Sequence, residues 1–542
     1  MLAAAATLFR SVEAKQSVAA KPLRNDQGAP CLAKTLTERC SSYLEKHMTY
    51  HSRRFGLSKS KITAFEQCPR RLWLSVHRRD LAKQDEGAEA RSATGHEVGA
   101  VANALIPNGV MIEAEPDLAA ALHLTRALLD GGHDTPIFEA TLEHDGVLVR
   151  IDVLQPDGTG GWRLAEVKSS TKAKDYHLGD LATQVWVARK SGVQITRAAI
   201  RHIDNRFVLE HEGDMHGLFA DTDLTILAEP IVATRANVVA AARMTLAGTE
   251  PDTAPGRHCD APFPCEFAGY CHSSLPAGPE WPVTVLPNGG GKRWIERDVT
   301  DLFAIDPADL KSVMHSRVHY ATVNAVVYHD CDGARAAMCD WAFPRTWLDF
   351  ETISFAVPRW VGTKPYSQVP FQFSAHVEGA DGEIDHREFL SLDGTDPRRA
   401  CAEALVAMIP ETGAVVGYNA SFEKSRILEL AAIFSDLADP LNGIASRVVD
   451  LLPVARNYWY HRDQRGSWSI KAVLPTVAAD LNYSDLEVKD GANAQQAYLE
   501  ATSVSCTTER RTELDFALRA YCGRDTEAMI VLARRLCTAT PE

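Results

Sequence analysis

Two acidic residues and one lysine lie in a predicted pair of neighbouring strands. Asp152 is in the run VLVRIDVL, Glu166 and Lys168 are in WRLAEVK, and a Gln-Pro-Asp-Gly turn separates the two runs. Because strand side chains alternate between faces, Glu166 and Lys168 share a face, and a hairpin can bring Asp152 beside them. Two carboxylates can hold Mg²⁺ or Mn²⁺, and an ammonium can offset negative charge developing on a phosphate. The pattern favours metal-dependent phosphodiester hydrolysis; the alternative is an ordinary solvated strand face.

A second set of acids lies in the C-terminal part of the chain. Asp349 and Glu351 share one face of the apolar strand TWLDFE, and Glu423 lies in a predicted helix that opens in GYNASFEKSR. Tyr521 and Asp525 are four residues apart in the last predicted helix, so they share a face of that helix. Four acids from separate elements, each in a largely apolar frame, are suitable ligands for a two-metal site.

Four cysteines form a third candidate site. Cys259, Cys265 and Cys271 are spaced C-x5-C-x5-C in an irregular, Pro-rich segment that has little hydrophobic material of its own. Such a segment needs a covalent or metal crosslink, and Cys68, far earlier in the chain, can supply a fourth thiolate. Four thiolates suit a 4Fe–4S cluster or Zn²⁺, and the spacing alone does not decide between these and free thiols.

The elements that must position these residues follow from periodicity and turn signals. Residues 57–80 read as one helix with Ser58 or Ser60 as its N-cap, and Gly192 can terminate a helix over 176–191. The other expected elements are a helical stretch over 97–131, strands over 137–154, a Pro/Gly-rich linker within 248–292, and alternating strands and helices from 346 onward.

Composition narrows the class of protein. The 542 residues are 45% hydrophobic and 24% charged, as in an ordinary globular protein of two to four domains. The formal net charge of −14 argues against a basic protein that coats nucleic acid non-specifically, although a local basic groove remains compatible with it. No run of about 18 apolar residues is found, so no membrane span is expected. Twelve cysteines are too sparse for a disulfide scaffold, which favours a reducing, cytoplasmic compartment.

The N-terminal 50 residues differ from the rest. The apolar run 1–9 has no basic residue before it and makes a poor signal peptide, although the stretch is acid-poor enough to imitate a transit peptide. Patterned sequence begins only near Gly56. We therefore expect residues 1–50 to be a disordered or over-extended start, with the functional chain beginning near Met48.

The first half of the chain resembles the iron–sulfur PD-(D/E)XK nucleases of the RecB/AddB type and of CRISPR adaptation. Besides the strand pair, the likeness rests on His96 in ATGHEVG, on Gln184 in the following helix, and on one cysteine before the nuclease core with three after it. It implies metal ligation by His96, Asp152 and Glu166, a catalytic Lys168, nucleic-acid contact by the Gln184 helix, and a 4Fe–4S cluster on Cys68, Cys259, Cys265 and Cys271. The family's Q-x-x-x-Y motif has Ala188 here in place of tyrosine.

The second half resembles the DEDD 3′–5′ exonucleases, which have an RNase H-like fold. The likeness rests on D-x-E, then N-x-x-F-E, then Y-x-x-x-D, and the whole arrangement resembles a bacterial family whose C-terminal domain has no known function. It implies that Asp349, Glu351, Glu423 and Asp525 bind two metals and that Tyr521 orients the attacking water. Glu423 departs from the aspartate usual there. In SWSIKAVLP, Ser469 and Lys471 are expected to contact nucleic acid.

Basic residues between 53 and 83, Arg70 and Arg71 among them, form a predicted phosphate-tracking strip with Trp73 interleaved. The alternative is a solvated helix face.

The expected fold class is α/β. The expected domains are the extension at 1–50, a restriction-endonuclease-like PD-(D/E)XK domain with its cysteine cluster at 51–275, a linker and connector at 276–340, and an RNase H-like domain at 341–542. The expected function is a Mg²⁺- or Mn²⁺-dependent nuclease in repair or defence. DNA is its favoured substrate, single-stranded or with processed ends, and a helicase or CRISPR-like protein is a candidate partner. The competing hypothesis is a non-catalytic nucleic-acid-binding or assembly scaffold.

Overall fold

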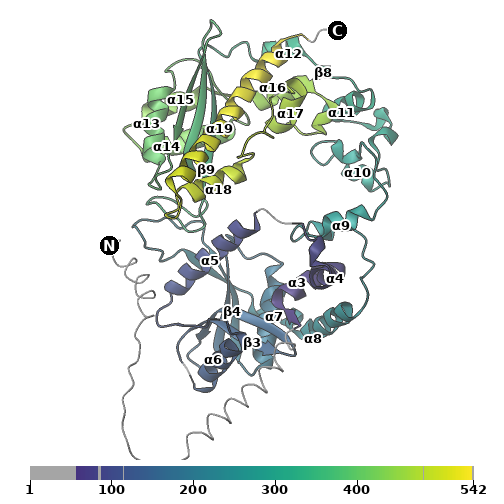
Figure 1. The fold of residues 1–542 in the computed structure, drawn as a ribbon, viewed down its shortest axis with the longest axis vertical. Coiled ribbons are helices and arrows are strands. Elements are labelled where there is room, and N and C mark those ends of the chain that lie inside the picture. The colour runs from purple at the N-terminus through teal and green to yellow at the C-terminus, as the bar shows by residue number, and fades with distance from the viewer. Residues whose placement is uncertain (1–55, 84–86, 114, 133, 480, 540–542) are drawn as a thin grey trace, which may run out of the picture. The chain divides into compact units, whose positions relative to one another are not determined.

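A computed structural model describes residues 56–83, 87–113, 115–132, 134–479 and 481–539. By their internal contacts, the described residues from Leu57 onward form one unit. The expectation for residues 1–50 lies outside the described residues. The remainder is a mixed α/β protein, as predicted, and its strands form two large sheets and one small pair (Figure 1).

The first sheet carries the first acid set. Its order is β2-β3-β4-β5-β6-β7, with β1 paired to β4, and β4 is antiparallel to both of its neighbours β3 and β5. The β4–β5 hairpin confirms the predicted strand pair. The connection from β5 to its parallel neighbour β6 runs through helix α7, His177–Lys190. The strands are β1 (Leu57–Ser58), β2 (Val110–Met111), β3 (Ile137–His144), β4 (Val147–Pro156), β5 (Trp162–Lys168), β6 (Ile195–Ile203) and β7 (Phe219–Asp223).

Two of the long predicted helices are each divided in the structure. The helix expected over 57–80 breaks at Cys68, because Pro69 begins a new helix and the residue before a proline is driven to an extended conformation. Ser58 is the N-cap, as predicted, and accepts a hydrogen bond from the amide of Lys61. The stretch 97–131 likewise contains two helices separated by β2. The helices are α3 (Lys59–Gln67), α4 (Pro69–His77), α5 (Ala88–Ala104) and α6 (Leu118–Asp130).

Helix α8 (Thr225–Ala247) is the one helix in the described ranges that is long and apolar enough to cross a membrane by length and composition. The sequence predicted no such span. In the structure α8 packs against α4 and α7. The buried guanidinium of Arg235 on α8 donates to Glu66 on α3 and to Thr183 on α7.

The second sheet carries the other acid set. Its order is β11-β10-β9-β12-β13, where β9, β10 and β11 are antiparallel and β12 and β13 run parallel to β9. The strands are β9 (Arg345–Ile353), β10 (Val369–Glu378), β11 (Ile384–Leu390), β12 (Val415–Gly417) and β13 (Val448–Asp450). Helices α13 (Arg398–Met408), α14 (Ser421–Ile433) and α15 (Ala438–Ser446) share one core with this sheet. Cores that contain α19 (Thr508–Cys537) also include residues of β9, and Figure 1 shows α19 as the long yellow helix.

Shorter elements complete this part of the chain. Three helices pack against α19: α16 (Leu451–Tyr458), α17 (Ile470–Val477) and α18 (Gly491–Ala501). The segment before β9 contains α9 (Ala268–Ser273), α10 (Lys292–Ile295), α11 (Val313–Val323), β8 (Tyr328–His329, paired with β14, Trp459–Tyr460) and α12 (Cys331–Ala337). From Trp281 onward, side chains of this segment are buried in the same core cluster as α19, so the residues before β9 are packed rather than loose.

Candidate functional site

The first acid set lies at a cavity of about 440 Å³ beside α5. Asp152 on β4 and Glu166 on β5 both line this cavity, as does His96 on α5. The structure therefore brings together the three residues that the sequence assigned as metal ligands. Other lining residues include Asn103, Glu113, Glu139 and Arg150.

The carboxylate of Glu166 is fully engaged by protein groups. Its side chain is 2% exposed, and its Oε1 accepts from the ammonium groups of both Lys168, at 2.7 Å, and Lys59. Its Oε2 accepts from the amide of Gln184. Burial alone would raise the pKa of Glu166, but the two lysines outweigh burial and lower that pKa to about 2. Glu166 is therefore held as a carboxylate.

Asp152 differs from Glu166 although the two lie side by side. Its Oδ2 accepts one hydrogen bond, from the amide of Val167 at 2.7 Å. Burial and the charge of Glu166 raise the pKa of Asp152 to about 8, against the opposing effect of Lys59. A cation at the cavity would favour the charged form of Asp152, so this pair of carboxylates is suited to binding one.

Two residues of this site were missed by the sequence reading. Lys59, the first residue of α3, lies 107 positions from Glu166, and no local pattern indicates their contact. Asp180 on α7 accepts from Lys168 at 3.4 Å and from Thr63 at 2.7 Å. The sequence carried a signal for Asp180, because it is four residues before Gln184 and so shares its helix face.

His96 and Glu139 are further candidate ligands at the first cavity. His96 is exposed on α5, and within the described residues the ligand atoms of His96, Asp152 and Glu166 do not all lie within 4.8 Å of one another. Glu139 on β3 has a positive φ of 55° and pairs with Arg150 at 2.9 Å. It is a further acid in the lining of the cavity.

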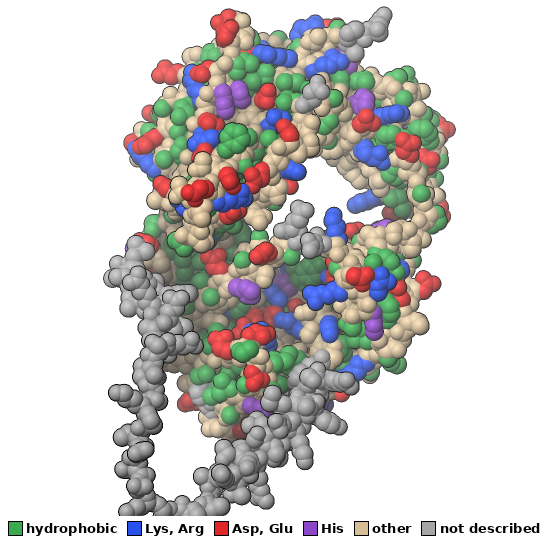
Figure 2. Space-filling view, viewed as in Figure 1, with side chains coloured by type: hydrophobic (Ala, Val, Ile, Leu, Met, Phe, Trp, Pro, Cys, Tyr) green, Lys and Arg blue, Asp and Glu red, His purple; other side chains and the backbone are tan. Residues whose placement is uncertain are grey.

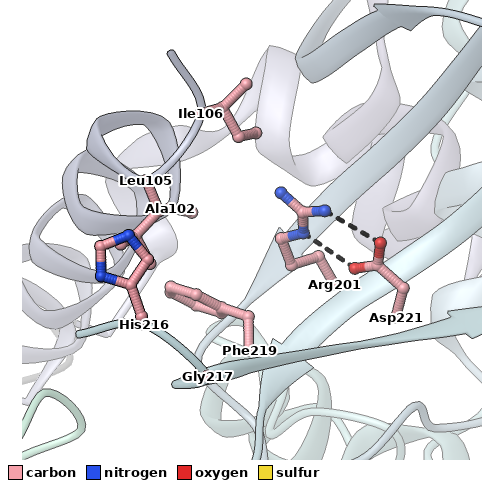
Figure 3. A pocket seen from close by; sticks show the side chains of 8 residues that line it. All are labelled: Ala102, Leu105, Ile106, Arg201, His216, Gly217, Phe219 and Asp221. Carbon is pink, nitrogen blue, oxygen red and sulfur yellow. Dashed lines mark hydrogen bonds and ion pairs between the residues drawn. The ribbon is translucent and has the colours of Figure 1, made fainter.

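A second cavity, of about 340 Å³, lies beside another face of α5 (Figure 3). Ala102 and Phe219 line it, and Arg201 and Asp221 form a two-bond ion pair of 2.8 and 2.9 Å within it. Both charges are satisfied by each other. It contains none of the acids of the first set.

The second acid set is more tightly gathered. Asp349, Glu351 and Asp525 each present a carboxylate oxygen within 4.8 Å of the other two, and within the described ranges this is the one cluster of three or more His, Cys, Asp or Glu ligands so spaced. Burial and mutual repulsion raise the pKa of Asp349 and of Glu351, and burial raises that of Asp525. Carboxylate oxygens are the preferred ligands of Mg²⁺ and Mn²⁺, so the donor set fits such an ion.

Glu423 lies close to this triad without joining it. It is 4% exposed on α14, and its Oε2 is buried with no hydrogen-bond partner. Burial raises its pKa to about 7. A side chain at Gly417, the last residue of β12, would place its Cβ 3.2 Å from this oxygen, so the glycine leaves room for the longer acid. An unpartnered buried carboxylate oxygen is costly and is a free ligand position.

Two tyrosines and a lysine surround the triad. Tyr483 donates to Asp525 at 2.5 Å, while Tyr521 accepts from the ammonium of Lys471 at 3.1 Å. Lys471 also donates to the carbonyl of Lys489 at 2.7 Å. Burial and the charge of Asp525 raise the pKa of both tyrosines. Lys471 was expected to contact nucleic acid; here it lies at the acids. Tyr483 was missed, because its segment carries no recognisable motif.

The four predicted cysteines line one cavity. Cys68, at the junction of α3 and α4, meets Cys259, Cys265 and Cys271 there, and His258 lines it as well. The side-chain amide of Gln67 donates to the carbonyls of residues 258 and 263, both at 2.7 Å, which joins α3 to the cysteine segment.

The spacing of the thiols bears on what they can hold. No three of the four sulfurs lie within 4.8 Å of one another in this described part of the chain. Zinc with thiolates at about 2.3 Å would hold its sulfurs about 3.8 Å apart. The four thiols line a cavity of only about 10 Å³ in this structure.

Three residues predicted to contact nucleic acid are engaged within the protein. Arg70 pairs with Glu250 at 2.6 Å and Arg71 pairs with Glu266 at 2.9 Å, so their charges bind the segment around the cysteines. Gln184 is fully buried and positions Glu166. The predicted contact of these side chains with nucleic acid stays a prediction, and in this structure each of them already has a protein partner. Figure 2 shows basic and acidic side chains interspersed over the visible face.

Comparison with known proteins gives similarity without a function. Residues 346–469, which contain three acids of the second set, match the profile of a family described as a domain of unknown function (DUF2779). Two uncharacterised proteins are similar over about 35% of the chain: MG366 of Mycoplasma genitalium, 26% identical over 207 residues, and its homologue in Mycoplasma pneumoniae, 27% identical over 209 residues. The matched region spans 31% of each relative's length. No solved structure matches.

Proposed function

We propose that this protein is a metal-dependent nuclease that hydrolyses phosphodiester bonds, with DNA as the favoured substrate. The observation that carries the proposal is the triad of the half-buried Asp349 and the buried Glu351 and Asp525, whose oxygens lie within 4.8 Å of one another. Three acids gathered without a matching cation raise one another's pKa and cost stability, a cost that a bound cation offsets. We further propose that the second sheet and α19 form an RNase H-like DEDD exonuclease domain.

The side chains around the triad support a hydrolytic role. Bound divalent cations would supply Lewis acidity to a phosphate and would lower the pKa of water. Tyr521 keeps its proton, because burial and nearby acids raise its pKa, and it accepts from Lys471. Its own O–H can therefore donate to an incoming water or phosphate oxygen. Glu423 is near enough for its charge to raise the pKa of Asp349, and its unpartnered Oε2 is available as a further ligand.

The first site supports a second, PD-(D/E)XK-type nuclease centre. Asp152 and Glu166 line one cavity with His96, and Lys168 is held between Glu166 and Asp180. In this position Lys168 stays protonated, because the nearby acids outweigh burial and raise its pKa. An ammonium so held can stabilise charge on a phosphate at the cavity.

We propose that the four cysteines hold a 4Fe–4S cluster that acts as a clamp between α3–α4 and the segment 256–273. Support comes from the cavity that the four cysteines line together. All ten described cysteines are free thiols, which suits a reducing compartment. Iron, sulfide and zinc analysis of anaerobically purified protein tests this; about one zinc and no iron would contradict it.

The scaffold alternative rests on one observation at the first site. Every acceptor oxygen of Glu166 already has a protein partner, as in a structural ion-pair network. In that case the first domain would bind nucleic acid or a partner protein without cleaving it, and only the second site would be catalytic.

Degradation of end-labelled single- and double-stranded DNA and RNA, with Mg²⁺ or Mn²⁺, tests the proposal. Asp152→Ala and Asp349→Ala should each remove a different part of the activity, and the exposed Asp381→Ala serves as the matched control. Retention of all activity in Asp152→Ala favours the scaffold reading for the first domain. A folded, cluster-loaded protein that cleaves none of these substrates contradicts the proposal.

A further inference from the structure

Lys59 reaches the first site from a separate element. It follows β1, which pairs with β4 through Leu57–Val147 and Ser58–Leu148, and it is the first residue of α3. Its backbone is thereby fixed to the strand that carries Asp152. Its side chain extends to Glu166 on the neighbouring strand and is 22% exposed, against 2% for Glu166.

Lys59 and Lys168 share a single oxygen, and this makes the arrangement unusual for a purely structural ion pair. Both ammonium groups bond Glu166 Oε1. Two like charges on one acceptor repel each other. Departure of one ammonium would relieve that repulsion and leave Glu166 with a partner.

Lys59 is the ammonium that can leave. Lys168 lies on the same strand as Glu166, two residues away, and also bonds Asp180. Lys59 bonds Glu166 through a flexible four-carbon stem from another element. It can therefore rotate away without moving β5.

We propose that Lys59 is a displaceable counter-ion of the first site: it holds Glu166 when no metal is bound, yields Oε1 to a divalent cation, and then binds the phosphate of the substrate. This inference rests on the proposed nuclease function. It assigns to Lys59 two opposite effects, competition with metal and attraction of substrate, which a structural salt bridge does not have.

The test is Mn²⁺ binding by titration calorimetry in an Asp349→Asn/Asp525→Asn background, which confines binding to the first site. Lys59→Met should tighten Mn²⁺ binding by about tenfold, because a competing positive charge is removed. Lys59→Arg should weaken Mn²⁺ binding, because a guanidinium binds a carboxylate with two parallel bonds. Lys190→Met, an exposed lysine at the end of α7, should change nothing.

The second arm measures substrate. At saturating Mn²⁺, in an otherwise wild-type chain, Lys59→Met should weaken binding of a short phosphorothioate DNA and slow cleavage assigned to Asp152. Tighter Mn²⁺ binding with unchanged DNA binding overturns the phosphate role, and unchanged or weaker Mn²⁺ binding in Lys59→Met overturns the counter-ion role. If Lys59→Met does not fold, Lys59→Arg decides alone by the sign of its effect.

These outcomes are separable from failure of the proposed function. Mn²⁺ binding in this background that Asp152→Asn leaves unchanged would mean that the first site is not a metal site. Binding that depends on Asp152 but ignores Lys59 would leave the nuclease proposal intact and overturn only the present inference.

Discussion

The two acid sites differ in how their buried negative charge is balanced. At the first site, lysines from two elements neutralise Glu166 and hold its pKa low. At the second, Asp349, Glu351 and Asp525 gather without a bonded cation, since Lys471 donates to Tyr521 and a carbonyl instead. Their pKa values rise accordingly.

The difference implies different responses to the metal ions proposed above. A neutralised carboxylate is stable without a metal and would have to exchange its lysine to bind one. An unneutralised triad destabilises the metal-free fold and would gain more stability from a bound cation. Substitutions at the two sites should therefore change the stability of the metal-free protein in opposite directions.

Glu166→Gln should produce the largest effect. It removes the charge that holds Lys59 and Lys168, and breaking such a buried pair costs about 3 kcal/mol of unfolding free energy. Urea unfolding in EDTA measures it, with the exposed Glu411→Gln as control. An unchanged urea midpoint would show that water, rather than Glu166, stabilises the two ammonium groups.

The pH dependence of stability should distinguish the second site. Glu423 has a raised pKa of about 7 in the folded protein, so between its ordinary value near 4.5 and about 7 the folded state keeps a proton that the unfolded chain has released. Stability therefore falls as pH rises through this window, by on the order of 2 kcal/mol. Unfolding at several pH values in EDTA should show a flatter profile for Glu423→Gln; an identical profile would contradict the assignment.

Asp349→Asn should raise the stability of the metal-free protein by about 1.5 kcal/mol, because it relieves repulsion at the triad. The same variant should lose most of the stabilisation that Mn²⁺ gives the second site. Thermal unfolding with EDTA and with Mn²⁺ measures both. A destabilised Asp349→Asn protein would mean that the triad is not under electrostatic strain.

Tyr483→Phe should have the smallest effect, about 1 kcal/mol of destabilisation, because one hydrogen bond to Asp525 is lost. Mn²⁺ should remove this difference in stability between Tyr483→Phe and the wild-type protein, if the cation replaces the tyrosine as partner of Asp525. Equal destabilisation with and without Mn²⁺ would place Asp525 outside the metal ligands.

The sequence predicted the parts of each site that lie close together along the chain. The β4–β5 hairpin placed Asp152 beside Glu166, and the i, i+4 pair of Tyr521 and Asp525 lies on one helix as expected. The break at Cys68 was also predictable, since Pro69 directly follows it.

The rest depended on how distant elements pack. Lys59 meets Glu166 across 107 positions, and Tyr483 reaches Asp525 from a segment with no motif. In the sequence, Arg70 and Arg71 belong to a basic strip. Only the fold shows that Glu250 and Glu266 pair with them. Gln184 is chemically suited to contact DNA, and only burial shows that its amide is used by Glu166.

Helix α3 has Lys59 at its first position and Cys68 capping its last turn. Its nine residues form a rigid rod whose ends are about 14 Å apart at 1.5 Å per residue. Gln67 ties the cysteine end to residues 258 and 263, and Lys59 ties the other end to Glu166. One short helix therefore contacts both the segment that carries the cysteines and the acids of the first site, so the two predicted sites share a structural element.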